Sequence, residues 1–193
     1  MLKERCIIKK VLFINGSLRE KSFNKTLALY VKSVLESKGV RVEFLDYKNI
    51  PYMNQDIEFP APKEISAIRE KVISADALWF FTPEYNGSIS GVLKNLFDWL
   101  SRPLDLSKMG EPRILADKIV TLSGAGGGSA TINSRTYLKG LLTNLVGGGA
   151  KVVYGDGVGI SLPASAWQTG ILELDTTHKE ELTKQAEELL KHI

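Results

Sequence analysis

Residues 77–81, Ala-Leu-Trp-Phe-Phe, are apolar at every position. A strand with one face in water alternates apolar and polar side chains, so this run predicts a strand that is buried on both faces. Strands of this kind belong to parallel sheets whose two faces are covered by helices. The run therefore favours an α/β fold, in which the rest of the chain has to supply the covering helices.

Strand and helix patterns alternate along the chain. Short apolar runs predict strands at 11–14, 40–45, 77–81, 119–122 and 151–154. Apolar residues at helical spacing predict helices at 24–38, 63–74, 91–100 and 134–146, and a capping box at 177–180 opens a last helix that ends near residue 191. This alternation predicts right-handed crossovers and a flavodoxin-like, doubly wound parallel sheet of five strands in order 2-1-3-4-5, with helices on both faces. We expect residues 1–193 to form a single domain of this kind.

Segments without apolar periodicity are expected to be loops. Residues 49–62 carry three prolines, residues 124–129 are rich in glycine, and residues 155–170 contain several glycines and a proline. In the helix at 134–146, the spacing predicts an inward-facing set of Tyr137, Leu138, Leu141, Leu142 and Leu145.

The composition argues against several classes of protein. The formal net charge of +3 comes without a long basic block, which gives no support for a nucleic-acid or membrane partner. A single cysteine, Cys6, excludes an intrachain disulfide and an iron–sulfur cluster. The two histidines, His178 and His192, both lie near the C-terminus, so we expect neither a metal site nor a Ser-His-Asp triad. The first residues lack the continuous apolar stretch of a signal peptide, and we expect a cytoplasmic protein.

The first predicted strand is followed by a loop with short polar side chains and one fixed charge. Ser17, Arg19, Ser22 and Asn24 lie just before a predicted helix N-terminus, where free amides and the positive dipole end favour an anion. Together they predict a cradle for a single phosphate group. Ser22 and Asn24 are also typical helix caps, so capping alone remains an alternative. The GxxxxGK[ST] motif is missing, and GxGxxG does not follow the first strand.

The strand at 77–81 leaves through a loop that suits a flat ring with polar edges. Pro83 fixes the direction of the chain, and Tyr85, Asn86 and Gly87 offer an aromatic edge, an amide and bare backbone. An ordinary turn, with Tyr85 packed on a neighbour, is the alternative. The glycines at 124–129 would let the backbone approach a cofactor, unless that loop is simply flexible. A phosphate cradle beside a ring-binding loop predicts a mononucleotide, and FMN is the natural candidate at such a switch point.

Two long motifs resemble those of the NAD(P)H-dependent FMN reductases, a flavodoxin-like family that includes quinone, azo and chromate reductases. The first is Gly16-Ser17-x-Arg19-x-x-Ser22-x-Asn24-x-x-Leu27-Ala28, and the second is Pro83-Glu84-Tyr85-Asn86-Gly87-Ser88, followed by Leu93-Lys94-Asn95 and Asp98-Trp99. Residues 50–56 are similar to the family's loop after the second strand. Ser90-Gly91 stands where the family pattern has Pro-Gly, which predicts a less sharply started helix at 91–100.

The resemblance implies a cofactor site for FMN. Ser17, Arg19, Ser22 and Asn24 would hold the phosphate; Pro83, Glu84, Tyr85, Asn86 and Gly87 would line the ribityl chain and the ring; and Ser123, Gly124 and Gly126 would touch the ring's other edge. NAD(P)H would reduce FMN, and a quinone, azo compound, free flavin or metal oxyanion would then take the electrons by a ping-pong mechanism. No catalytic side chain and no metal ligand are expected, because the hydride chemistry belongs to the flavin.

Two other functions stay open at this point. The protein could supply reduced FMN to a partner monooxygenase, or it could be a flavodoxin-like electron carrier without its own NAD(P)H reaction. The mildly basic charge disfavours the carrier, because flavodoxins are usually acidic. The resemblance also implies a homodimer or homotetramer to which the helix at 91–100 contributes. Lys94 and Asp98 are spaced for an ion pair on that helix.

Overall fold

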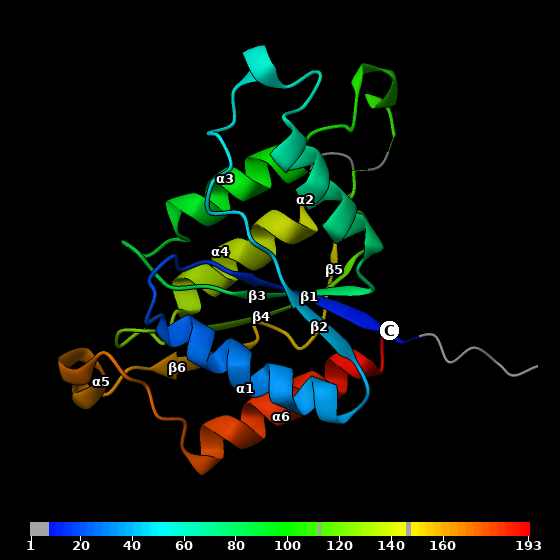
Figure 1. The fold of residues 1–193 in the computed structure, drawn as a ribbon. Helices are drawn as coiled ribbons and strands as arrows, with labels where there is room; N and C mark the ends of the chain where they lie inside the picture. Colours follow the sequence, from blue (N-terminus) through cyan, green and yellow to red (C-terminus); the bar gives the residue numbers. More distant parts are fainter. Residues whose placement is uncertain (1–7, 112, 146–147) are drawn as a thin grey trace, which may run out of the picture.

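The computed structural model describes residues 8–111, 113–145 and 148–193, so Cys6 and Val146 lie outside the described residues (Figure 1). One six-stranded sheet forms the centre of the molecule, with the order β2-β1-β3-β4-β5 and with β6 also paired to β4. All of its pairings are parallel. The strands are β1 (Lys10–Asn15), β2 (Arg41–Phe44), β3 (Ala77–Phe81), β4 (Ile119–Gly126), β5 (Lys151–Val152) and β6 (Val158–Ser161). The predicted order 2-1-3-4-5 and the flavodoxin-like class are confirmed.

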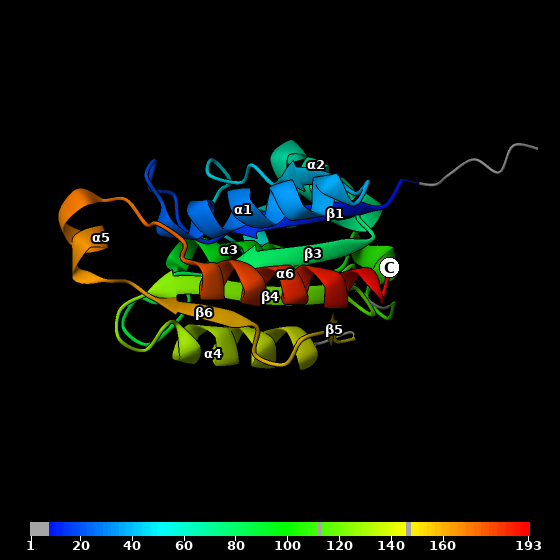
Figure 2. The same ribbon diagram turned by 90° about the horizontal axis from the view of Figure 1, so that it is seen from below.

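Helices cover both faces of the sheet (Figures 1 and 2). They are α1 (Phe23–Ser37), α2 (Lys63–Ser74), α3 (Gly91–Leu100), α4 (Ile132–Thr143), α5 (Ala164–Thr169) and α6 (Thr176–Leu190), with short 3-10 turns η1 (Gln55–Ile57) and η2 (Leu106–Lys108). Helices α1 and α6 pack on one face, and α2, α3 and α4 pack on the other. In Figure 2, α1 and α6 lie side by side across the sheet.

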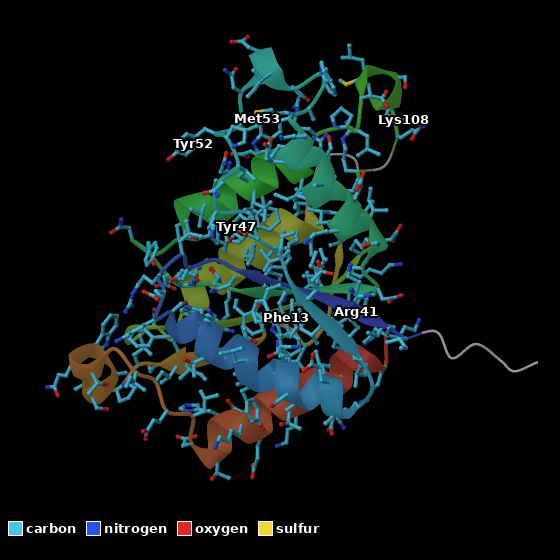
Figure 3. The ribbon with its side chains drawn as sticks, viewed as in Figure 1. Phe13, Arg41, Tyr47, Tyr52, Met53 and Lys108 are labelled. Atoms are coloured by element: carbon cyan, nitrogen blue, oxygen red, sulfur yellow. The ribbon has the colours of Figure 1, made fainter. Side chains whose placement is uncertain are left out.

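The continuous apolar run of β3 is explained by this two-sided burial. All five of its residues are buried. Trp79 and Phe81 face α1 and α6, and their stacked rings meet the edge of Phe13, which lies near the middle of the molecule in Figure 3. Leu78 and Phe80 point to the opposite layer, which α2, α3 and α4 complete. Each large side chain buried in this way contributes about 2 kcal/mol of hydrophobic stabilisation.

The part of the sheet that β4, β5 and β6 form differs from the prediction. β4 runs on to Gly126, so the first three residues of the expected loop at 124–129 are strand. They pair with β6, which lies in the segment that was expected to be an irregular loop, together with α5. β5 is two residues long and ends before Tyr154. Local patterns missed β6 because its short sequence, Val-Gly-Ile-Ser, becomes a strand only through its pairing with β4.

Two helix predictions also need correction. α4 begins at Ile132, and Tyr137 is 46% exposed although its spacing predicted an inward side chain. The predicted end of this helix at Val146 lies outside the described residues. α6 begins after Asp175, whose carboxylate accepts from the amide of His178 at 2.8 Å, so the cap is Asp175 and not the predicted box at 177–180. Among the described residues, no helix has the length and apolarity needed to cross a membrane.

Candidate functional site

The loops after β1 and β3 leave the sheet at the same level, beside β4, which runs on for three residues past Ser123 to Gly126. Asn15, Phe81 and Ser123 are register partners across the three strands. The ladder continues one residue further, because the amide of Gly16 donates to Phe81 at 2.8 Å and the amide of Thr82 donates to Ser123 at 2.8 Å. The three polar loops predicted from the sequence are therefore brought together at the carboxyl edge of the sheet, on the left in Figure 1.

The first of these loops is held in place by two buried side chains. Ser22 is the N-cap of α1, and its hydroxyl accepts from the amide of Lys25 at 3.3 Å. The side-chain amide of Asn24 donates to the carbonyl of Ala125 at 3.1 Å and accepts from its amide at 2.9 Å. The Asn24 side chain thus ties α1 to the end of β4, which leaves its backbone, rather than its side-chain amide, to face a ligand.

The rest of this loop offers a donor set that fits a phosphate. Arg19 is exposed, and its guanidinium lies over the ring of Phe23, 4.8 Å from the centroid. The first turn of α1 contains no acidic residue, so no side chain there neutralises the positive end of the helix. A cavity of about 430 Å³ opens beside the loop, with Ser17, Arg19 and Lys25 in its wall. The carboxylates of Glu20 and Asp46 also line this cavity.

The loop after β3 is a tight hairpin. The backbones of Tyr85 and Ser88 exchange two hydrogen bonds of 3.0 Å. Between them, Asn86 has φ 52° and Gly87 has φ 72°, the two left-handed residues of a type I′ turn. Tyr85 is 48% exposed, and a Cβ at Gly87 would meet nothing within 4 Å. The hairpin therefore presents an aromatic side chain and open backbone at the edge of the sheet, while Pro83 is buried at its base.

Glu84 joins this hairpin to the next loop. Its carboxylate accepts hydrogen bonds from the hydroxyl of Ser129 at 2.8 Å, the side-chain amide of Asn133 at 3.0 Å and the backbone amide of Ser134 at 3.1 Å. Burial opposes ionisation of the carboxyl, but these hydrogen bonds outweigh it and hold the pKa of Glu84 below its usual range. Ser134 is in the first turn of α4, so Glu84 caps that helix from the loop after β3.

The end of β4 is packed more tightly than its glycines predicted. The hydroxyl of Ser123 lies in the core, where it accepts from the indole of Trp79 at 3.0 Å and donates to Gln185 at 2.8 Å, so its side chain faces away from the three loops. A Cβ at Gly124 would lie 2.1 Å from the hydroxyl oxygen of Thr131, and one at Gly126 would lie 2.7 Å from its methyl group. These two glycines make room for Thr131.

Ser90 links the loop before α3 to the first loop. Its hydroxyl donates to the carbonyl of Gly16 at 2.6 Å and also accepts from the amide of Leu93, which caps α3. The expectation that Ser90 would start this helix less sharply than proline is therefore wrong, because the serine side chain supplies the cap. A Cβ at Gly16 would come within 2.4 Å of Leu93, so the glycine of the first loop allows close packing against α3.

Sequence reasoning missed Tyr47, which supports the first loop from β2. Its side chain is 5% exposed, and its hydroxyl donates to the carbonyl of Asn15 at 2.7 Å. Burial raises the pKa of Tyr47 well above its ordinary value, so the hydroxyl stays protonated as a donor. One tyrosine after a short strand carries no local signal for such a contact. No group of three or more metal-binding side chains occurs in the part of the chain that the structure describes.

The strand order and the three loops at the carboxyl edge of the sheet define a flavodoxin-like α/β protein, and solved structures agree. FerB, a flavoenzyme NAD(P)H:(acceptor) oxidoreductase from Paracoccus denitrificans, superposes with a TM-score of 0.76 at 22% identity, covering 96% of this chain and 99% of FerB. A flavodoxin from Streptococcus pneumonia superposes with a TM-score of 0.57 at 14% identity, covering 96% and 99% of the two chains. At these identities the likeness shows the fold alone.

The family is shown by the sequence comparisons. The profile of the NADPH-dependent FMN reductases matches residues 9–157, and the chain belongs to this family. An NAD(P)H:quinone oxidoreductase of Solanum tuberosum is 36% identical over 134 residues, which is 67% of this chain and 65% of the potato protein. An NAD(P)H-dependent FMN reductase of Pseudomonas aeruginosa is 38% identical over 137 residues, 70% of each chain. The match thus spans slightly less than two thirds of the potato protein. Within the family, the members named here are NAD(P)H-dependent oxidoreductases.

Proposed function

We propose that this protein is an FMN-dependent oxidoreductase that uses NAD(P)H to reduce a small-molecule acceptor such as a quinone, azo compound, free flavin or metal oxyanion. The observation that carries the proposal is that the loops after β1, β3 and β4 meet at the carboxyl edge of the sheet, where one fits a phosphate and another presents an aromatic hairpin. The quinone and FMN reductases among the relatives support the same reaction class. When bound, FMN supplies hydride and electron transfer between donor and acceptor, which makes ping-pong kinetics part of the proposal.

The residues divide into those that would contact FMN and those that hold the contacting residues. Ser17, Arg19 and the backbone at the start of α1 would bind the phosphate, with Ser22 and Asn24 fixing that backbone. Tyr85, Asn86 and Gly87 would face the ring from the hairpin, on the base formed by Pro83.

The residues at and after the end of β4 also divide into those that would contact FMN and those that hold the contacting residues. The open backbone of Gly127 and Gly128 would lie at the ring's other edge, since nothing is within 4 Å of a Cβ at either position. Ser123, Gly124 and Gly126 would act through their backbone only, and Glu84 would hold the loop in place.

Self-association is a further part of this proposal. The apolar side of α3 is core, with Leu96 and Trp99 fully buried. On its outer side, Lys94 and Asp98 pair at 2.6 Å and line a cavity of about 560 Å³ between α3 and α4, together with the exposed Tyr137. A homodimer or homotetramer that covers this groove would give a multiple of 21.3 kDa by light scattering, and a monomer at micromolar concentration would rule it out.

A cytoplasmic location also remains a proposal.

The first experiment is an absorption spectrum of the purified protein, recorded before and after anaerobic addition of NADPH or NADH. We expect an oxidised-flavin spectrum that either nucleotide bleaches, and the relative rates would rank the two donors. Tight retention of FMN through purification would favour a resident cofactor. Ready exchange would favour a supplier of reduced flavin to a monooxygenase. A bound flavin that neither nucleotide reduces would favour an electron carrier. A protein that takes up no FMN would contradict the proposal.

A matched pair of variants tests the phosphate site. Arg19→Met should weaken FMN binding by about tenfold, the size expected from loss of one charge-assisted phosphate contact. Lys21→Met removes another exposed positive charge two positions further along the same loop and should change binding less than about twofold. Equal losses of FMN affinity in the two variants would mean that the phosphate is bound through the overall positive charge of the loop and not through a specific contact with Arg19.

A further inference from the structure

Arg135 is a buried cation next to the third loop of the site, and neither its sequence context nor the family motifs single it out. It lies on α4 and is 5% exposed. Its guanidinium donates to the hydroxyl of Thr131 at 3.2 Å, to the carbonyl of Ala130 at 3.3 Å and to the carbonyl of Gly157 at 2.7 Å, with a further bond to the carbonyl of Asp156. Burial lowers the pKa of Arg135, against the raising effect of the Asp156 and Glu84 charges.

The contacts of Arg135 are unusual for a buried arginine because every acceptor is a neutral oxygen. Arg135 takes part in none of the salt bridges among the described residues, and Asp156 pairs instead with Lys139 at 3.0 Å. A buried charge without a carboxylate partner costs stability, and an apolar side chain of similar length would fill the same space without that cost. Packing alone therefore does not account for an arginine here, whereas a planar group with several fixed donors can hold several carbonyls at once.

Glycines form the walls of the slot that holds Arg135 and Thr131. A Cβ at Gly159 would lie 2.2 Å from a guanidinium nitrogen and 2.3 Å from the carbonyl of Ala130. Gly159 on β6 is the register partner of Gly124 on β4, where a Cβ would strike the Thr131 hydroxyl. Two side chains from the start of α4 thus fill the space that these strand glycines leave open.

The backbone next to this slot is strained. Ala130 has φ 47° and Thr131 has φ 61°, although neither residue has the glycine or asparagine chemistry that favours left-handed backbone. Thr131 is the N-cap of α4, yet its hydroxyl makes no capping bond and accepts from Arg135 instead. Such strain persists only where surrounding contacts over-determine the conformation, and it is concentrated at functional sites.

We propose that Arg135 is a positioning residue that holds the loop at 127–131 in the single conformation needed to receive the FMN ring. This inference rests on the proposed function. Arg135 acts from the buried side of the loop through Ala130 and Thr131, while Glu84 acts from the outer side through Ser129 and Ser134. With both groups in place, Gly127 and Gly128 already present their backbone to the site. FMN binding then loses no affinity to the conformational entropy of ordering this loop.

The test compares Arg135→Lys and Arg135→Met with Lys139→Met, which removes a cation one turn further along the same helix at a partly exposed ion pair. The dissociation constant of FMN is measured by quenching of flavin fluorescence with apo-protein, well below the melting temperature of each variant. We expect Arg135→Lys, which keeps the charge but lacks the planar fork, to raise the dissociation constant by about tenfold or more. Lys139→Met should change it by less than about twofold.

A second readout needs no flavin. Amide hydrogen exchange in apo-protein should become faster at residues 127–131 in the Arg135 variants and remain unchanged at residues 85–88. If Arg135→Met fails to fold, Thr131→Ala removes the hydroxyl acceptor and should raise the dissociation constant by about threefold. Unchanged FMN affinity in Arg135→Lys, with only a lower melting temperature, would overturn the inference and leave Arg135 as a folding contact. A wild-type protein that binds no FMN would instead overturn the proposed function, and the exchange data would still test the ordering of the loop.

Discussion

Two neighbouring loops of the candidate site each contain a pair of consecutive left-handed residues, and the two pairs arise in different ways. In the hairpin after β3 the pair is Asn86-Gly87, with φ 52° and 72°. After β4 the pair is Ala130-Thr131, with φ 47° and 61°. Asparagine and glycine tolerate this backbone, so the hairpin follows from its own sequence. Alanine and threonine do not, so the second pair depends on contacts from Arg135, Glu84 and the strand glycines.

The comparison shows that one binding site can contain a loop whose shape follows from its own sequence beside a loop whose shape depends on packing against distant residues. The hairpin should keep its shape when its neighbours are altered, because its two hydrogen bonds lie within residues 85–88. The second pair should relax when any of its outside contacts is removed. Four stability measurements test this contrast, each of them independent of FMN.

The largest expected effect is at the glycine that admits Thr131. Gly124→Ala would place a Cβ 2.1 Å from the Thr131 hydroxyl and 2.5 Å from the backbone oxygen of Thr82, so the structure has to shift. We expect the free energy of unfolding to fall by about 3 kcal/mol in urea denaturation. Gly127→Ala is the control: its Cβ would meet nothing within 4 Å, and the change should stay within about 0.5 kcal/mol. Equal effects at both positions would mean that Gly124 is not a packing glycine.

Glu84→Gln should destabilise the protein by about 1.5 kcal/mol at pH 7, because it removes a charged acceptor of three hydrogen bonds. The pKa of Glu84 is lowered in the folded state, so its contribution is present above the unfolded glutamate pKa of about 4.3 and is lost as pH falls through the folded pKa. Melting temperatures of wild type and variant should therefore differ at pH 7 and converge in acid. The exposed Glu20→Gln serves as control, and a gap that persists into acid would show that charge is not the cause.

Gly87→Ala should cost about 1 kcal/mol, since alanine at φ 72° is strained although its Cβ would meet open space. Gly128→Ala, where the backbone is not left-handed and a Cβ also meets open space, is the matched control and should be near neutral. Thermal unfolding at pH 7 measures both. A neutral Gly87→Ala would mean that the hairpin can change its turn type, against a shape set by its own sequence.

The smallest effect has the opposite sign. Ala130→Gly should raise the free energy of unfolding by about 0.5 kcal/mol, because relief of the left-handed alanine slightly exceeds the extra entropy that glycine gives the unfolded chain. Chemical denaturation with a precision of a few tenths of a kcal/mol suffices. A clear loss of stability would show that the left-handed backbone at 130–131 is not strained. The proposed difference between this loop and the hairpin at 85–88 would then be wrong.

Much of the fold was predictable because its signals are local or nearly so. The ranges of α2, β3 and α3 follow from apolar periodicity, and the type of loop at 85–88 follows from its Asn-Gly pair. The site was predicted as three loops, which the sheet does bring together. Which groups in those loops face a ligand was less predictable, because the side chains of Asn24, Glu84 and Ser123 are used by contacts with distant segments.

The sequence by itself determined the α/β class, from the alternation of strand and helix patterns, and the turn at 85–88, from its Asn-Gly pair. The same alternation predicted the strand order, because parallel strands joined through helices need right-handed crossovers. Only the tertiary structure decided that β6 pairs with β4, that Gly124 and Gly126 make room for Thr131, and that Arg135 holds the loop in front of α4. The physical reason is that these contacts join segments far apart in the chain. A glycine or a left-handed alanine in the sequence does not reveal which distant side chain will lie against it.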